Sequence, residues 1–268
     1  MINIKMINQI KTCVILAGGL GSRITEETID KPKPMVTIGN LPIIHHIMNH
    51  YSKYGINHFI ICAGYKSEII KKYFYDLLKF SGNIEVDYTS KKLSKIKSVS
   101  EEFSKWRIQI IETGSNSNTG GRIKKIEKYV NGQNFFLTYG DGLSDVNLSK
   151  LAQRHLSNKN NKVTITAVKR NNRFGNLVID KQNYVTRFVE KDKKNEEMIN
   201  GGFHVINKDV LQLIKKPSCS WEFDILEQLS KKKQLMCYQH KGFWQCMDNL
   251  REKQLLEDLW NSKKAPWL

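Results

Sequence analysis

Cysteine is scarce in this sequence, and the few cysteines present are not arranged in pairs. The 268 residues include five cysteines, an odd number, and no two of them have the C-x-x-C spacing. A disulfide framework and a structural zinc site are therefore both disfavoured. We expect all five to be reduced residues of the core, namely Cys13, Cys62, Cys219, Cys237 and Cys246.

Long apolar runs are also absent. No stretch approaches the roughly 18 to 20 apolar residues that span a bilayer, and residues 1–11 lack the apolar region of a secretory signal. The sequence thus predicts no membrane partner and a cytoplasmic location.

Arginine is rare although the chain is strongly basic. The net charge is +17, yet only eight of the 43 basic residues are arginine, and the lysines are spread through most of the predicted helices. Arginine is the residue favoured for reading the bases and phosphates of nucleic acids. The pattern indicates a lysine-rich, solvated surface and no nucleic-acid partner.

The apolar residues that are present follow a pattern typical of an α/β fold. Alternating strands and helices predict a Rossmann-like, mixed but mostly parallel sheet flanked by helices. The serine- and lysine-rich residues 89–105 are expected to be the least ordered part of the chain. In the first half, strands are expected at 13–17, 59–63, 84–88, 106–112 and 134–139, and helices at 41–55, 69–77 and 119–129.

The second half of the chain continues this pattern. A chain of 268 residues is large enough for one elaborated domain. We predict a single domain over residues 11–268, with halves at 11–150 and 151–268 and a short extension at 1–10. In the second half, strands are expected at 163–168, 177–179, 184–190 and after Asn200, and helices at 148–156, 209–215, 221–231 and 249–260.

A glycine-rich turn follows the first predicted strand. Gly18, Gly19 and Gly21 come directly after Ala17, and residues without a Cβ let backbone N–H groups approach a phosphate closely. The spacing fits neither G-x-x-x-x-G-K-[ST] nor G-x-G-x-x-G, because Ile24 stands where the third glycine would be. The turn is a candidate anion-binding loop, with an ordinary strand-to-loop turn as the alternative.

Two cations lie close to this turn in the sequence. Arg23 carries a planar fork suited to phosphate oxygens, and Lys33 stands between two prolines that restrict its direction. Both are candidates for binding a phosphorylated ligand. The alternative is a surface ion pair with Glu26 or Glu27.

A candidate carboxylate is predicted at the same edge of the sheet. Asp141 follows the expected strand 134–139. In an open α/β sheet, ligands bind beyond the carboxyl ends of the strands. We therefore expect Asp141 and the glycine turn to share one crevice.

Residues 16–23 (LAGGLGSR) and 31–35 (KPKPM) resemble the signature of the sugar-1-phosphate nucleotidylyltransferases. Residues 140–145 and 242–248 are similar to motifs of the cytidylyl branch, the glucose-1-phosphate cytidylyltransferases. The resemblance implies a nucleotide-diphospho-sugar transferase fold and synthesis of CDP-glucose and pyrophosphate from CTP and glucose 1-phosphate. It also implies Mg²⁺ as cofactor, a homo-oligomer, and a role in bacterial surface-polysaccharide metabolism such as O-antigen synthesis.

The same resemblance implies roles for matching residues. Arg23 and Lys33 would be the catalytic cations, and Asp141 and Asp248 would hold Mg²⁺, although capping of the following helix is an alternative for Asp248. The expected nucleotide-binding residues are Leu16, Ala17, Gly18, Gly19, Gly21, Ser22, Arg23, Lys33, Thr119, Gly121, Arg122 and Gly140. The expected sugar-phosphate-binding residues are Glu190, Lys191, Asn200 and Gly201, which by themselves read as an ordinary strand end and an ordinary turn.

The choice of base has a physical basis. Cytosine presents acceptors at O2 and N3, whereas uracil carries a donor at N3, so an arginine fork favours CTP. Arg122 is the candidate for this contact, because Gly120 and Gly121 beside it would let a base approach the backbone. The alternative is an arginine that opens a helix and binds no ligand.

Departures from the family pattern concern the acceptor. Ser22 replaces the usual threonine, residues 169–172 replace a proline-containing turn, Asp192 replaces a proline, and residues 223–224 also differ. These departures leave open another phosphorylated acceptor. A second alternative is a regulatory module that binds sugar nucleotides without turnover. Retention of both metal-site aspartates argues against the second alternative, and the missing third glycine disfavours a nicotinamide-dependent oxidoreductase.

Overall fold

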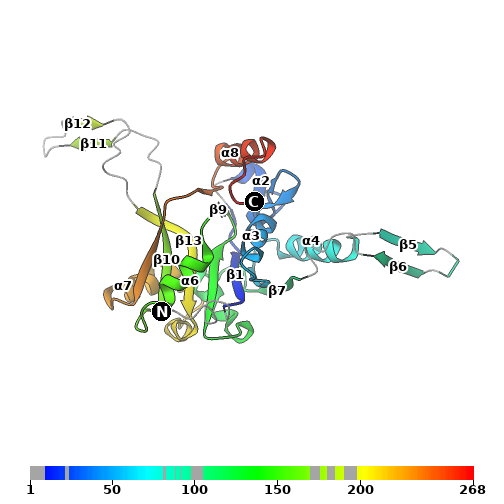
Figure 1. Cartoon of the computed structure of the whole chain (residues 1–268), viewed down its shortest axis with the longest axis horizontal. Helices are drawn as coiled ribbons and strands as arrows, with labels where there is room; N and C mark the ends of the chain where they lie inside the picture. Colours follow the sequence, from blue (N-terminus) through cyan, green and yellow to red (C-terminus); the bar gives the residue numbers. More distant parts are fainter. Residues whose placement is uncertain are drawn as a thin grey trace.

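The computed structural model describes residues 10–21, 24–80, 83–87, 89–90, 92–97, 105–169, 176–179, 185–189 and 198–268. Within these ranges the chain forms one seven-stranded sheet and four separate two-stranded pairs. Figure 1 shows helices packed around the central sheet and two β-hairpins at opposite ends of the view. No helix in the described ranges is long and apolar enough to span a membrane.

The central sheet is mixed and mostly parallel, as the sequence predicts. Its order is β14–β10–β13–β8–β1–β4–β7, and the two antiparallel pairings are those of β13 with β10 and β8. The β13–β8 pairing joins the two halves of the chain into one sheet. The strands are β1 (Thr12–Ala17), β4 (His58–Ala63), β7 (Arg107–Glu112), β8 (Asn134–Tyr139), β10 (Val163–Lys169), β13 (Met198–Asn207) and β14 (Leu235–His240).

The remaining described strands form short antiparallel pairs. They are β2 (Thr37–Ile38) with β3 (Leu41–Pro42), β5 (Asn83–Asp87) with β6 (Lys92–Lys97), β9 (Gly142–Ser144) with β15 (Trp244–Cys246), and β11 (Asn176–Ile179) with β12 (Val185–Val189). The β9–β15 pair is the important one for function. It brings the loop after β8 next to a segment about one hundred residues later in the chain.

The described helices connect and cover these strands. The α-helices are α2 (Thr25–Thr28), α3 (Ile43–Ser52), α4 (Ser67–Phe80), α5 (Thr119–Lys125), α6 (Leu148–Leu156), α7 (Glu227–Lys231) and α8 (Leu250–Asn261). Three 3₁₀ helices are η1 (Lys33–Met35), η2 (Glu127–Tyr129) and η3 (Lys208–Leu213), and η4 (Trp221–Leu226) is a π-helix. A π-helix is uncommon and frequently lies at a functional site.

Strand β1 lies in the middle of the core and is buried along its whole length. Ile15 packs on one face of the sheet in a cluster that includes Ile47 of α3, and Val14 packs on the other face with Ile123 of α5. Both faces are therefore covered. This explains the apolar run without alternation that predicted a buried parallel strand.

Some details of the predicted fold are wrong. Residues 92–97 form β6, although their composition suggested irregular structure, because pairing with β5 satisfies their backbone. Asn200 lies inside β13 instead of before it, and the helix expected at 209–215 is the 3₁₀ helix η3. The strands β9, β14 and β15 were not predicted.

The prediction that all five cysteines are core residues is also wrong. Cys13 and Cys62 are buried, but Cys219 and Cys246 are half-buried and Cys237 is exposed. Cys237 lies on β14 at the edge of the central sheet, where one side of the strand is open. All five thiols are free, as expected.

Candidate active site

The glycine turn and Asp141 lie at the same edge of the sheet. β1 and β8 are parallel neighbours with Leu16 opposite Tyr139, and the Gly140 N–H donates to the Leu16 carbonyl oxygen at 3.0 Å. A Cβ on Gly140 would lie 2.9 Å from that oxygen, so only glycine allows the two strand ends to approach this closely. The predicted shared edge is confirmed.

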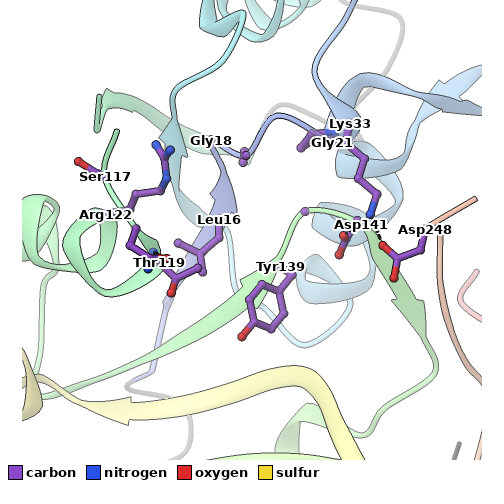
Figure 2. A pocket seen from close by; sticks show the side chains of 15 residues that line it. Leu16, Gly18, Gly21, Lys33, Ser117, Thr119, Arg122, Tyr139, Asp141 and Asp248 are labelled. Atoms are coloured by element: carbon purple, nitrogen blue, oxygen red, sulfur yellow. Dashed lines mark hydrogen bonds and ion pairs between the residues drawn. The ribbon is translucent and has the colours of Figure 1, made fainter. Parts of the chain in front are cut away.

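Lys33 is held rigidly and points to two carboxylates. The extended Pro32 (φ −70°, ψ 149°) leads into the 3₁₀ turn η1, where Met35 N–H donates to the Pro32 oxygen at 2.8 Å. Lys33 Nζ lies 2.6 Å from Asp141 Oδ2 and 2.6 Å from Asp248 Oδ1 (Figure 2). The side chain of Lys33 is only 11% exposed, so solvent screens these ion pairs weakly.

The electrostatic environment of Lys33 keeps it charged. Burial lowers its pKa, but the charges and hydrogen bonds of Asp141 and Asp248 together outweigh burial and raise the pKa. The sequence left two alternatives open, a surface ion pair for Lys33 and helix capping by Asp248, and neither holds. Glu27 pairs with Lys253 and Lys31 instead of Lys33, and Asn249, not Asp248, caps helix α8.

Two cavities meet at the pair of carboxylates. The larger, of about 450 Å³, extends from the glycine turn to α5, and the smaller, of about 300 Å³, lies against β13 and β15. Tyr139, Asp141 and Asp248 line both cavities. The carboxylates therefore lie where ligands in the two cavities would meet.

The larger cavity contains most of the residues predicted to bind the nucleotide. Gly19 has no heavy atom of the described chain within 4 Å of a built Cβ, so the space beside it is open. Ser22 and Arg23 lie outside the described residues. The predicted residues that line this cavity are Leu16, Ala17, Gly18, Gly19, Gly21, Lys33, Thr119, Arg122, Gly140, Asp141 and Asp248.

Gly121 is placed differently from the prediction. It is not among the described residues that line the larger cavity, and a Cβ on it would lie 2.0 Å from the Pro217 oxygen. A Cβ on Gly120 would likewise lie 2.7 Å from the Cys219 oxygen. These two glycines let α5 pack against residues 217–219, so the idea that they admit a base to the backbone is not supported.

Arg122 lies in the wall of the larger cavity and binds a neighbouring loop. It is 6% exposed. Its Nη1 donates to Thr113 Oγ1 at 2.7 Å and to the Gly114 oxygen at 2.8 Å, and its Nη2 donates to the Ser115 oxygen at 3.3 Å. The guanidinium thus fixes the loop that leads to Ser117, another lining residue. Whether Arg122 also binds a nucleotide stays a prediction.

The smaller cavity contains the described part of the predicted sugar-phosphate site. Asn200 and Gly201 line it, whereas Glu190 and Lys191 lie outside the described residues. The indole Nε1 of Trp244 donates to the Gly201 oxygen at 2.7 Å and fixes the strand at this point. Asn200 Oδ1 accepts the Gly202 N–H at 3.0 Å.

Sequence reasoning missed Tyr139, which lines both cavities, and Glu222, which accepts its hydrogen bond. The Tyr139 hydroxyl donates to Glu222 Oε1, and Thr119 Oγ1 donates to Glu222 Oε2 at 2.7 Å. Burial raises the pKa of Glu222, but hydrogen bonds, with that from Tyr139 foremost, outweigh burial and lower it. The available sequence signal for Tyr139 was its place at the end of β8, but Glu222 carries no local motif.

Asp141 and Asp248 form a donor set suited to a hard divalent cation. Both are partly exposed, at 30% and 31%, and carboxylate oxygens are the ligands that such cations prefer. Glu252 Oε2 accepts the Asp248 N–H at 2.6 Å and so holds this segment in place. Burial, with the charges of Glu252 and Asp248, raises the pKa of the nearby Cys246 to about 12, which keeps its thiol protonated.

Comparison with known proteins finds relatives of this chain in both sequence and fold. The chain matches the sequence profile of the nucleotidyl transferase family over residues 12–250. It is 43% identical over 255 residues to the glucose-1-phosphate cytidylyltransferase of Salmonella typhimurium, covering 95% of this chain and 97% of the relative. It is 35% identical over 255 residues to the probable glucose-1-phosphate cytidylyltransferase of Bacillus subtilis, covering 95% and 98%. The crystal structure of HddC from Yersinia pseudotuberculosis complexed with GMP-PN has a TM-score of 0.67 at 23% identity, covering 94% and 100%.

Proposed function

The chain belongs to the nucleotidyl transferase family, and on this premise we propose that it transfers the cytidylyl group of CTP to glucose 1-phosphate. The products are CDP-glucose and pyrophosphate. The 43% identity to glucose-1-phosphate cytidylyltransferase over nearly the full length of both chains supports this choice of substrates.

The observation that carries the proposal is the position of Asp141 and Asp248 at the junction of the two cavities. Transfer of a nucleotidyl group requires a triphosphate and a sugar phosphate to meet at one phosphorus atom. We assign the nucleotide to the larger cavity, beside the glycine turn, and the sugar phosphate to the smaller one, beside Asn200. The junction is then the reaction centre.

The residues of the chain can support direct in-line attack. An oxygen of the sugar phosphate attacks the α-phosphorus and pyrophosphate leaves, so no covalent enzyme intermediate is needed. Catalysis of this type depends mainly on positioning and on electrostatic stabilisation. The open space at Gly19 allows backbone N–H groups to contact phosphate oxygens, and Lys33 supplies a fixed positive charge.

We infer that Mg²⁺ is the divalent cation of this site. Asp141 and Asp248 would hold it, since hard oxygen donors from a few carboxylates fit Mg²⁺, which keeps its other positions for waters and phosphate oxygens. When bound, the ion would neutralise negative charge on the phosphates. Lys33 shares these carboxylates and offsets one of their two negative charges before any ligand enters.

The proposal is tested by measuring pyrophosphate release with a panel of substrates. The panel combines CTP, UTP, GTP and dTTP with glucose 1-phosphate, mannose 1-phosphate and a heptose 1-phosphate, each with Mg²⁺. We expect the highest kcat/KM with CTP and glucose 1-phosphate. A clear preference for another sugar phosphate with CTP would mean that this compound, and not glucose 1-phosphate, is the acceptor. Absence of pyrophosphate release from every pair would contradict an enzymatic role.

A further inference from the structure

A line of hydrogen bonds runs behind the smaller cavity. Trp221 at the start of η4 lies next to His204 of β13, with Nε1 and Nδ1 3.3 Å apart. His204 Nε2 lies 2.9 Å from Asn200 Oδ1, which also accepts the Gly202 N–H. The line therefore connects η4 to a residue that lines the cavity.

The same line continues beyond Asn200. Tyr139 interacts with the side chain of Asn200, and the hydroxyl of Tyr139 donates to the carboxylate of Glu222. Glu222 directly follows Trp221 in the chain, so both ends of the line belong to η4. Disturbing η4 should therefore affect both sides of Asn200.

The chemistry of the two ends fixes the direction of every hydrogen bond between them. An indole N–H can only donate, and an ionised carboxylate can only accept. His204 Nδ1 must therefore accept from Trp221, which leaves the proton of the neutral ring on Nε2. Because Nε2–H then donates to Asn200, the oxygen of the amide faces His204 and its nitrogen is left as a donor.

His204 is suited to hold this arrangement without touching a ligand. It is fully buried and is not among the described residues that line either cavity. Burial lowers its pKa to about 4, so the ring is neutral near pH 7. A neutral ring has one donor and one acceptor nitrogen, and both are used here.

We propose that His204 is a positioning residue that sets the orientation of the Asn200 amide and thereby the recognition of the acceptor substrate. Asn200 Oδ1 is occupied by two donors of the protein, so the amide N–H groups are what it offers to the cavity. The group that meets Asn200 is therefore a hydrogen-bond acceptor, such as a hydroxyl oxygen of the sugar. This inference rests on the proposed function, which assigns the smaller cavity to the sugar phosphate.

The kinetic test compares three variants of the full-length protein. His204→Leu removes the ring nitrogens, and His204→Gln keeps one acceptor for Trp221 and one donor for Asn200. His155→Leu is the matched control, because His155 is also buried with a pKa lowered to about 4 but bonds Thr164 and lines neither cavity in the described part of the chain.

The expected result is a selective change in KM. Loss of one hydrogen bond corresponds to about a tenfold rise in KM for glucose 1-phosphate in His204→Leu, with the KM for CTP within about twofold. His204→Gln should recover most of the loss. Equal KM values for glucose 1-phosphate in His204→Leu and His155→Leu, or parallel rises in both KM values of His204→Leu, would overturn the inference. If the wild-type protein releases no pyrophosphate, the proposed function has failed instead.

A spectroscopic measurement tests the positioning role without turnover. In ¹⁵N-histidine-labelled protein, the His204 signals are identified by their absence from His204→Gln. We expect a protonated Nε2 and an unprotonated Nδ1 at pH 7, and a shift of both signals in Trp221→Phe. A protonated Nδ1 would reverse the direction of the hydrogen bonds and overturn the inference.

Discussion

Lys33 Nζ and Asp248 Oδ1 lie 2.6 Å apart although 215 residues separate them in the chain. Asp141 Oδ2 lies at the same distance from the ammonium. An ammonium between two carboxylates occupies the oxygens that a divalent cation would use, so lysine and cation compete for them. A cation bound to these oxygens would displace Lys33, which would then be free to contact phosphate.

Replacement of Lys33 should separate these two roles. In Lys33→Met we expect turnover with CTP to fall at least about 100-fold, because a fixed charge at the reacting phosphate is lost. Ligand-free protein should bind Mn²⁺ about tenfold more tightly, because the competing ammonium is gone. Steady-state pyrophosphate release and Mn²⁺ titration followed by electron paramagnetic resonance measure the two effects. Lys31→Met, which loses only an outer pair with Glu27, is the control, and unchanged turnover in Lys33→Met would contradict the role.

The two carboxylates should each be needed for the cation. Asp141→Asn and Asp248→Asn are expected to weaken Mn²⁺ binding and to raise the Mg²⁺ concentration for half-maximal activity by about tenfold or more, since each removes one anionic ligand. Asp209→Asn is the control, because Asp209 pairs with Lys162 away from both cavities. Mn²⁺ affinity equal to that of Asp209→Asn would show that the cation is held elsewhere.

Arg122 should affect both nucleotide choice and stability. Arg122→Ala removes three hydrogen bonds to residues 113–115, so we expect the free energy of unfolding to fall by about 2 to 4 kcal/mol. The ratio of kcat/KM for CTP over UTP should also fall, because the arginine and the loop it holds line the nucleotide cavity. Urea unfolding and kinetics with both triphosphates test this. A normal CTP preference in a destabilised variant would leave Arg122 with a purely structural role.

The parts of the site that the sequence predicted correctly depend on local geometry. The run of β1 showed that both of its faces are covered, and the end of β8 placed Asp141 beside the glycine turn. The prolines on either side of Lys33 correctly predicted that its direction is restrained. Each of these inferences uses only a few neighbouring residues and the rules of parallel sheets.

The parts that the sequence did not reveal depend on contacts between distant segments. Sequence spacing alone could not predict that Asp141 and Asp248 lie close together. They are brought together by the pairing of β9 with β15, two short strands with little sequence pattern of their own. We expected Gly121 to let a base approach the backbone, but the space beside it is occupied by the carbonyl oxygen of residue 217. His204 carries no motif, and its position behind Asn200 appears only when η4 packs against β13.

Buried histidines should make the protein less stable in mild acid. Burial lowers the pKa values of His45, His50, His155 and His204 to about 4, whereas an unfolded histidine has a pKa of about 6.5. Between pH 6.5 and 4 the unfolded chain therefore binds more protons, and the free energy of unfolding falls as pH falls. The expected slope is about 1 kcal/mol per pH unit for each histidine. Urea unfolding at pH 7, 6 and 5 measures this slope. His155→Leu should reduce it by the contribution of one histidine, about 1 kcal/mol per pH unit. A flat profile would mean that these rings keep pKa values near 6.5 in the folded protein.

Two glycines of the site should respond differently to alanine. A Cβ on Gly140 would lie 2.8 Å from Pro34 Cγ and 2.9 Å from the Leu16 oxygen, so Gly140→Ala should lower the free energy of unfolding by about 1 to 3 kcal/mol. Gly19 has open space and no left-handed backbone, so Gly19→Ala should fold within about 1 kcal/mol of the wild type. Its added methyl group would nevertheless keep a phosphate away from the backbone N–H groups, which predicts a KM for CTP at least about tenfold higher. Thermal unfolding and steady-state kinetics distinguish the two variants. A normal KM for CTP in Gly19→Ala would show that the backbone at this position does not contact the triphosphate.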